Sequence, residues 1–383
     1  MKNCINKIIA GVMALTLAFA MTACGNNDEQ AEVKPSEEAS VSEEASGEAK
    51  TRTITDVLGR TVEIPEKVER IVPLGNASRI ATYLGLQDKF VTVCSGDRNT
   101  TPYMAYGWFN QDKWADLPVA ASGGYGVFHP EVILAAEPDV ILCTFEPDIV
   151  KSIEEQTGLP VVAVAQGTLF GEDYEQALRI FGDVCGVSDR AEEVISYING
   201  CLDELESLTK DVPNENKPLV LGAGATFRGG HGIDGVYVDY PVFTAIKAND
   251  AAVGLDKQSF DTGVEVDKEQ ILAWDPDYIF IDAGNIGLVN EQYASDPGFF
   301  DQLKAVKEGH VYQWPNSTCN YTNVEIPLVG AYYAGSILYP EQFANINFEE
   351  KAEEIFKFFL GGEGYLQVLS DNGFGYNQVE IGK

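Results

Sequence analysis

Short runs of apolar residues recur along the chain and predict buried strands. Such runs lie at residues 70–74, 91–94, 140–143, 161–165 and 219–221. Between these runs, apolar residues follow the spacing of amphipathic helices. Strands that alternate with helices are typical of a parallel sheet that is covered by helices on both faces. The pattern therefore predicts an α/β protein.

One helix–strand unit occurs twice. The segment from Glu131 to Ile141 and the segment from Glu269 to Ile279 share the pattern E-x-I-L-A-x-x-P-D-x-I. Each copy predicts a short helix, a break at Pro-Asp and a buried strand. A unit repeated in this way predicts two similar α/β lobes, and two lobes imply a cleft between them.

The longest predicted helix lies between the two copies. It begins at Asp189 and runs to about Lys210, with its apolar residues along one stripe. We therefore expect an N-terminal α/β lobe over residues 53–172, a helical connection over residues 173–213 and a C-terminal α/β lobe over residues 214–383. The predicted fold is two Rossmann-like lobes with central parallel sheets, joined by one long interlobe helix.

The N-terminal residues predict an export signal. Lys2 and Lys7 precede an apolar run too short for a permanent membrane span, and small residues lead to Cys24. This arrangement resembles a bacterial lipobox, in which residues 1–23 are removed and Cys24 receives a lipid. An ordinary signal with a coincidental cysteine is the alternative. Residues 24–52 are rich in Glu and Ser, and we expect them to form a disordered acidic tether to the extracytoplasmic face of the cell membrane.

The charge of the chain bears on its partners. Its 383 residues carry a formal net charge of −33. Such a chain repels phosphate backbones, which argues against nucleic-acid binding. The sign of a small ligand stays open, because a few local residues decide it.

The cysteines beyond Cys24 contain no C-x-x-C pair and mostly lie in apolar contexts. These contexts favour buried thiols, and one disulfide remains the alternative in an exported protein. The residues are Cys94, Cys143, Cys185, Cys201 and Cys319.

The order of these features resembles the class III periplasmic-type binding proteins, which serve ABC importers of iron–siderophores, haem and cobalamin. The resemblance covers the chain from about residue 52. It rests on the predicted hairpin at residues 53–64, both copies of the repeat, the long helix between them and the C-terminal pattern over residues 331–360. It implies a transport protein with no catalytic residues and no resident cofactor, because the metal arrives within the ligand.

The resemblance also implies a docking role for Glu131 and Glu269. In the family, one exposed glutamate on each lobe pairs with arginines of the permease dimer, which a cytoplasmic ATPase drives. Each of these glutamates stands in the first turn of its predicted helix, where the helix dipole favours a carboxylate. Plain helix stabilisation by a first-turn acid is the alternative.

Candidate ligand contacts lie just after the predicted strands, where open parallel sheets bind ligands. A glycine-rich loop at residues 222–232 can approach a ligand closely. Arginine supplies fixed donors and aromatic rings supply flat walls. Core packing for the aromatic residues and a solvated loop charge for Arg98 remain alternatives. The first candidates are Arg228, Tyr103, Trp108, Tyr125 and Trp314, followed by Arg98, Tyr106, His231, Asn76 and Tyr321.

The expected function is therefore capture of a metal chelate, a ferric siderophore first, and its delivery to the permease. Molybdate or tungstate, and haem or a corrinoid, are alternative ligands. A lipid-anchored enzyme on the same scaffold is the alternative from another class, although no G-x-S-x-G nucleophile motif occurs. The three histidines, His129, His231 and His310, lack the spacing of a zinc site, so we expect no metal bound directly by the protein.

Overall fold

The computed structural model describes residues 50–98, 101–122, 126–257, 262–318 and 322–383. The predicted signal, Cys24 and nearly all of the tether lie outside these residues, as do Tyr125, Cys319 and Tyr321. In the described part of the chain, every helix is too short or too polar to cross a membrane.

The first lobe contains the predicted hairpin and a parallel sheet. Strands β1 (Thr51–Thr55) and β2 (Thr61–Pro65) pair antiparallel. Strand β6 (Val140–Cys143) lies between β3 (Ile71–Leu74) and β7 (Val161–Ala163), and both neighbours run parallel to it. The remaining elements of this part are α1 (Ala77–Tyr83), β4 (Val93–Cys94), α2 (Ala105–Trp114), β5 (Val119–Ala121), α3 (Pro130–Ala135) and α4 (Pro147–Thr157).

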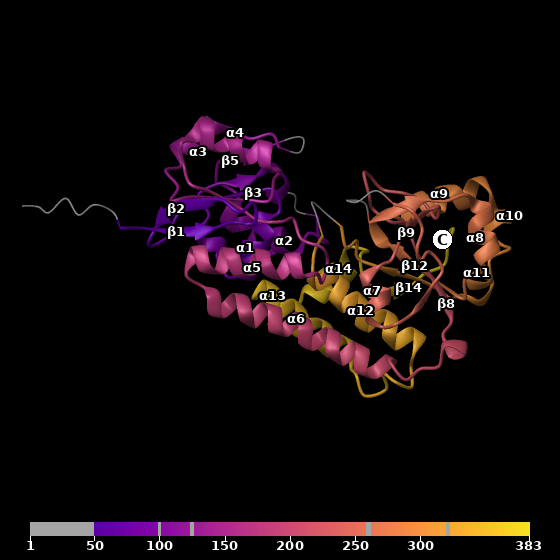
Figure 1. Ribbon diagram of the computed structural model, residues 1–383. Coiled ribbons are helices and arrows are strands. Elements are labelled where there is room, and N and C mark those ends of the chain that lie inside the picture. The colour runs from indigo at the N-terminus through magenta and orange to yellow at the C-terminus, as the bar shows by residue number, and fades with distance from the viewer. Residues whose placement is uncertain (1–49, 99–100, 123–125, 258–261, 319–321) are drawn as a thin grey trace, which may run out of the picture. The chain divides into compact units, whose positions relative to one another are not determined.

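Two helices connect this lobe to the second. Helix α5 (Glu172–Cys185) and helix α6 (Ser188–Thr209) run side by side (Figure 1), and α6 also contacts the second lobe through α12 (Glu325–Leu338) and α7 (Pro241–Ala245). The long interlobe helix is therefore confirmed. Its apolar stripe is buried, because it faces helices on both sides rather than water.

The second lobe is built on a mixed sheet. Strand β12 (Tyr278–Asp282) lies between β8 (Leu219–Ala223) and β13 (Val311–Trp314), and all three are parallel. The sequence predicted only parallel strands, but three short strands at the sheet's margins pair antiparallel. These are β9 (Gly235–Tyr237), β11 (Gly263–Glu265) and β14 (Asn377–Gln378), while the short β10 (Asn249–Asp250) is parallel to β8.

The repeated unit has the same structure in both lobes. Helix α8 (Lys268–Trp274) leads into β12 as α3 leads into β6, and each strand lies between two parallel neighbours. The repeated aspartate also has the same role in both lobes. Asp139 accepts from the backbone N–H of Arg70 at 2.8 Å, and Asp277 accepts from that of Leu219 at 2.7 Å. Each carboxylate thus fixes the start of the neighbouring strand.

The C-terminal helices return to the first lobe. Helix α13 (Phe348–Leu360) packs on α12 and contacts α1 and α2, and α14 (Tyr365–Asp371) follows it. The Arg190 guanidinium on α6 donates to the carbonyls of Tyr83 and Phe358 at 3.1 and 2.7 Å. One apolar core consequently runs through residues of both lobes, and it includes Phe181, Phe243 and Phe356. The remaining helices are α9 (Ile286–Ser295), α10 (Pro297–Phe300) and α11 (Lys304–Glu308).

Candidate ligand-binding cleft

A cleft of about 630 Å³ lies between loops of the two lobes. The first lobe contributes the turn of its hairpin and the loops that follow β6 and β7. The second lobe contributes residues after β9 and β13. Strand ends are where parallel sheets bind ligands, so the position of the cleft agrees with that rule. Residues from both sides include Phe145, Gln166, Leu169, Tyr240, Ser317 and Thr322.

Neutral hydrogen bonds hold the wall of the first lobe together. The backbone N–H of Asn76 donates to Thr144 Oγ1 at 2.8 Å, and Asn76 Nδ2 donates to the carbonyl of Gln166 at 3.3 Å. Gly75 has a φ of +70°, and a Cβ at this residue would lie 2.4 Å from Thr144 Oγ1. Only glycine permits this approach. The loops after β3, β6 and β7 are thereby fixed to one another.

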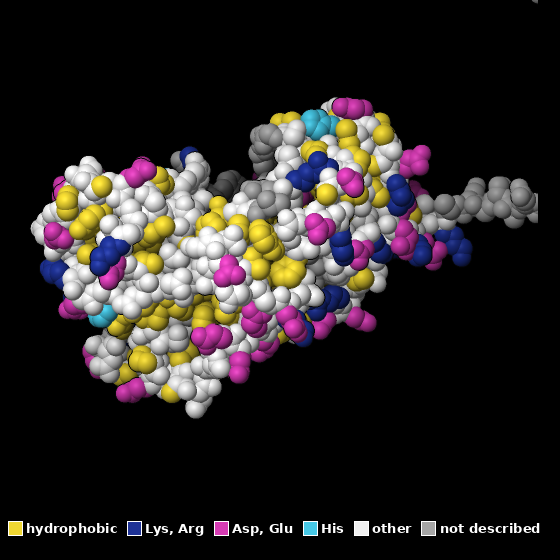
Figure 2. Space-filling model, turned by 180° about the vertical axis from the view of Figure 1, so that it is seen from behind, with side chains coloured by type: hydrophobic (Ala, Val, Ile, Leu, Met, Phe, Trp, Pro, Cys, Tyr) yellow, Lys and Arg dark blue, Asp and Glu magenta, His cyan; other side chains and the backbone are white. Residues whose placement is uncertain are grey.

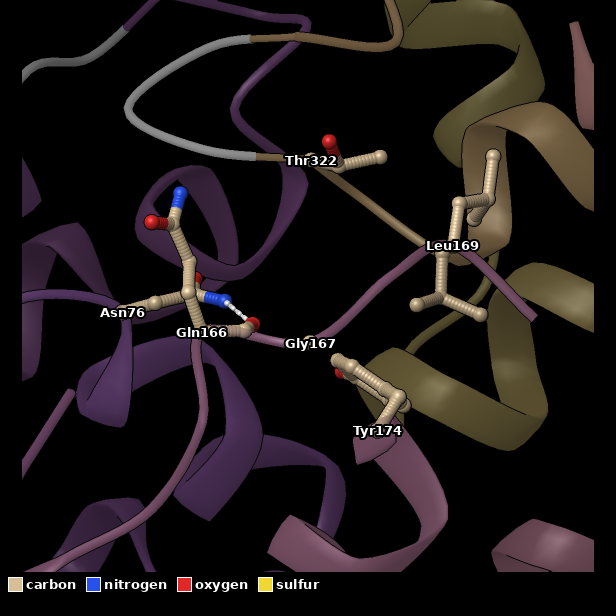
Figure 3. Close-up of a pocket in the computed structure, with 7 residues that line it drawn as sticks. Asn76, Gln166, Gly167, Leu169, Tyr174 and Thr322 are labelled. Carbon is tan, nitrogen blue, oxygen red and sulfur yellow. Dashed lines mark hydrogen bonds between the residues drawn. The ribbon is translucent and has the colours of Figure 1, made fainter. Parts of the chain in front are cut away.

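A small pocket extends the cleft (Figure 3). Asn76, Gln166, Gly167, Leu169 and Tyr174 come from the first lobe and its connection, and Thr322 comes from the second. Four of these residues also line the larger cleft. The pocket has about 10 Å³ of space, which suits one water molecule.

A buried carboxylate organises the wall of the second lobe. Asp282 is fully buried and accepts three hydrogen bonds, from the Tyr237 hydroxyl at 2.7 Å, Trp314 Nε1 at 3.1 Å and Thr226 Oγ1 at 3.2 Å. Burial raises the pKa of Asp282 to about 7, although the three donors oppose the shift. Tyr240, on the cleft wall, stacks on Tyr237 with ring centroids 4.1 Å apart.

The charged residues around the cleft are mostly acidic. Glu146, Asp173, Asp239 and Lys257 are the charged residues among those that line it. Asp173 accepts from the backbone N–H and the hydroxyl of Thr168, and Asp239 accepts from the backbone N–H of Gly254 at 2.9 Å. On the face drawn in Figure 2, acidic side chains occur at many places over both lobes. The described wall is therefore a poor match for an anion.

The structure distributes the predicted contact residues over several places. Asn76 lines the small pocket. Trp314 and Tyr106 are 2% and 1% exposed, so both lie in the core and outside the cleft lining. Trp314 bonds to Asp282 behind the wall, and the Tyr106 hydroxyl donates to Asp97 at 2.8 Å. These two aromatic residues therefore pack in the core, which was the alternative to contact with a ligand.

Four other predicted residues lie outside the lining of both cavities. Tyr103 is half-buried, with its ring 4.8 Å from that of Phe374, and Trp108 packs against the core from helix α2. Arg98 is exposed and donates to the carbonyl of Leu117. His231 stacks on Phe227 at 3.9 Å.

Arg228 lies at the tip of the glycine-rich loop. It is exposed, has a φ of +51°, and stands between Thr226 and Gly230, which form an antiparallel bridge. It too lies outside the cavity lining, while Tyr125 and Tyr321 lie outside the described residues. The roles of Arg228 and its neighbours in binding stay predictions.

Several lining residues were absent from the sequence prediction. The loop after β7 contributes Gln166, Gly167 and Leu169, and Tyr240 lies three residues after the end of β9. The strand-end rule, applied to the run at residues 161–165, would have found the first three. Strand β9 has only three residues, so no sequence signal identified Tyr240.

Glu131 and Glu269 occupy equivalent positions outside the cleft. Both are exposed and stand in the first turn of their helices, α3 and α8. Four of the five predicted core cysteines, Cys94, Cys143, Cys185 and Cys201, are buried free thiols.

Comparison with known proteins gives the family. The chain belongs to the periplasmic binding protein family, which matches residues 80–318. This membership favours a binding function over the enzyme alternative. A comparison with curated protein sequences gave no match.

Solved structures share the fold. A periplasmic solute binding protein from Veillonella parvula is 21% identical with a TM-score of 0.66, and the match covers 84% of this chain and 98% of that one. The molybdate periplasmic binding protein MolA of Haemophilus influenzae is 19% identical with a TM-score of 0.62, covering 82% and 99%. Helicobacter pylori CeuE with Ni(II) bound is 16% identical with a TM-score of 0.58, covering 82% and 97%.

Proposed function

We propose that this protein is the solute-binding component of an ABC importer and that it carries a metal chelate in the cleft. The cleft of about 630 Å³ between the strand ends of the two lobes is the observation that carries the proposal. Pockets for organic ligands typically measure about 300–1,000 Å³. A single oxyanion would fill only a small part of such a space. The protein needs no cofactor of its own, since the metal arrives within the ligand.

The charge of the wall narrows the ligand class. Three carboxylates and one lysine line the described cleft. A tungstate or molybdate site requires converging donors and positive charge, whereas a neutral or cationic chelate tolerates acidic surroundings. The wall therefore supports a ferric hydroxamate-type chelate over an oxyanion or an anionic catecholate chelate. Aromatic lining by Phe145 and Tyr240 suits a bulky organic ligand.

Docking to the permease uses the outer ends of the lobes. Exposed first-turn carboxylates at Glu131 and Glu269 can pair bidentately with arginines of a permease dimer. Lipid on Cys24 and the acidic segment at residues 24–52 would hold the folded part at the extracytoplasmic face of the membrane.

Calorimetric titration with a panel of ligands tests the proposal. The probes are the ferric complex of deferoxamine, a ferric tris-catecholate, haem, a corrinoid and tungstate. We expect tight binding of the hydroxamate complex and none of tungstate. Tight tungstate binding without any response to the chelates would overturn the ligand class.

A matched pair of variants locates the site. Ala165 lines the cleft, and Ala135 is exposed on α3. We expect Ala165→Phe to weaken binding at least tenfold, because the added ring occupies ligand space, and Ala135→Phe to leave the affinity unchanged. Equal affinities for the two variants would place the ligand elsewhere.

A further inference from the structure

The buried carboxylate of Asp282 is connected to the cleft by hydroxyl groups. The Tyr237 hydroxyl lies 2.7 Å from Asp282 Oδ2 and 3.3 Å from Ser317 Oγ. Ser317 lines the cleft, and so does Tyr240, whose ring stacks on that of Tyr237 with centroids 4.1 Å apart. A line of hydrogen bonds therefore runs from the buried acid to the surface that a ligand meets.

The ionised acid fixes the direction of this line. A carboxylate can only accept, so the Tyr237 hydroxyl must donate its one proton to Asp282. The oxygen of Tyr237 is then free to accept, and the Ser317 hydroxyl donates to it. Ser317 consequently presents only lone pairs to the cleft.

Protonation of Asp282 exchanges the donor and acceptor roles along this line of hydrogen bonds. Oδ2 of the neutral acid donates to the Tyr237 oxygen, and Tyr237 then donates to Ser317 Oγ. The hydroxyl hydrogen of Ser317 stays on its oxygen and turns toward the cleft, which Ser317 lines. One proton has been added to the group, and the cleft wall gains one hydrogen-bond donor.

We propose that Asp282 is a positioning residue that sets whether Ser317 offers an acceptor or a donor to the ligand. At a pH above the titration range of Asp282, the wall favours ligand ammonium, N–H or O–H groups. Below it, the wall favours carboxylate or carbonyl oxygens. The negative charge of ionised Asp282 acts in the same direction, since it attracts cations and repels anions.

The surroundings of Asp282 allow it to titrate in the accessible range. Its pKa of about 7 follows from burial. The titratable groups that face it are the phenols of Tyr237 on β9 and Tyr240, and burial raises the pKa of both phenols, so neither ionises near neutral pH. Thr226 and Trp314 face it from the loop after β8 and from β13, and neither titrates. In the described residues, all of its hydrogen-bond donors are uncharged.

A titration of the ligand-free protein tests the relay directly. Trp314 Nε1 donates to Asp282 Oδ1, so tryptophan fluorescence followed from pH 5 to 9 should report its ionisation. We expect a transition near pH 7 that Asp282→Asn abolishes. Ser317→Ala should shift the midpoint, because the ionised state loses a donor to Tyr237 while the neutral state loses an acceptor for Tyr237, and these two losses differ in energy. A transition that persists in Asp282→Asn, or a midpoint that Ser317→Ala leaves unchanged, would overturn the proposal.

A matched pair of chelates tests the effect on the ligand, and this part rests on the proposed function. The ferric complex of deferoxamine carries an ammonium group, and its N-succinyl derivative carries a carboxylate instead. Between pH 5.5 and 8.5 the ratio of their affinities should shift about threefold to tenfold toward the ammonium form. The ratio should be constant in Asp282→Asn. An identical shift in that variant would overturn the relay, whereas binding of neither chelate, with the fluorescence results as expected, would count against the ligand class alone.

Discussion

The two lobes carry the same unit and use it differently at the cleft. Thr144 and Asp282 stand at equivalent positions, each thirteen residues after the repeated glutamate. In the first lobe this position holds a neutral hydroxyl that accepts from the backbone of Asn76. In the second lobe it holds a buried acid that accepts from three side chains. The outer ends of the lobes are alike, whereas at the cleft ends the first lobe has a residue that does not titrate and the second has Asp282, whose pKa burial raises.

The comparison also separates two tasks. The repeated Glu, Pro and Asp govern the outer end of each lobe, where Asp139 and Asp277 fix the start of a strand. The residue at the cleft end is outside the repeated pattern. A docking surface shared by two lobes requires similarity, whereas a ligand without twofold symmetry requires two different walls.

The largest effect is expected from the glutamates that the lobes share. Charge reversal by Glu131→Arg or Glu269→Arg should each lower uptake of the chelate to less than about a tenth, because like charges then meet at the permease. Both side chains are exposed outside the cleft, so chelate affinity should stay constant. Transport assays in cells and calorimetry on the purified protein measure the two quantities. Loss of affinity in either variant would place that glutamate in the site or the fold.

The wall of the first lobe should be sensitive to added volume at Gly75. Gly75→Ala should lower the free energy of unfolding by about 3 kcal/mol, since the Cβ meets Thr144 Oγ1 at 2.4 Å in a left-handed backbone conformation. Gly85 has a similar φ of +75° with nothing within 4 Å of the added Cβ, so Gly85→Ala should cost only about 1 kcal/mol. Urea unfolding measures both. Equal costs would mean that backbone conformation alone decides the effect.

The buried acid behind the wall of the second lobe should make the stability of the protein depend on pH. The pKa of Asp282 is about 7 in the folded protein and about 3.9 in an unfolded chain, so the folded state binds the proton more tightly. Stability should therefore fall as pH rises between these values. From pH 5 to 8 the loss should be about 2–3 kcal/mol. Urea unfolding at several pH values should show that Asp282→Asn removes this slope.

Variants of Asp250 and Thr144 are the controls for this change of stability with pH. Burial raises the pKa of Asp250 to about 6, so Asp250→Asn should remove a smaller part of the slope. Thr144→Ser, at the equivalent position of the first lobe, should leave the slope unchanged. A slope that survives in Asp282→Asn would contradict the assignment of the titration to the second lobe.

The smallest effects are expected from the repeated aspartates of the two lobes, Asp139 and Asp277. Asp139→Ala and Asp277→Ala each remove an acceptor for a strand's first N–H, and each should cost about 1–2 kcal/mol in urea unfolding. Asp301 is exposed, and Asp301→Ala should change stability by less than about 0.5 kcal/mol. A large difference between the two repeat variants would show that the units are alike in geometry but unlike in energy.

The sequence by itself determined the local elements and their order. The repeat, the long helix of the connection and most of the strands followed from spacing and from Pro-Asp breaks, because these signals act within a few residues. The parallel core of each sheet also followed. The antiparallel margins of the second sheet and helix α2 did not, since short segments of mixed polarity carry no clear period.

Only the tertiary structure decided which side chains line the cleft. The sequence placed Trp314 and Tyr106 just after predicted strands, yet Trp314 is the last residue of β13, Tyr106 lies in α2, and packing buries both in the core. Gln166 and Tyr240 line the cleft because loops from distant parts of the chain meet there. An aromatic side chain has the same local signal in a core and in a binding wall. Its role depends on neighbours tens or hundreds of residues away, and the return of α13 to the first lobe illustrates how the folded chain supplies them.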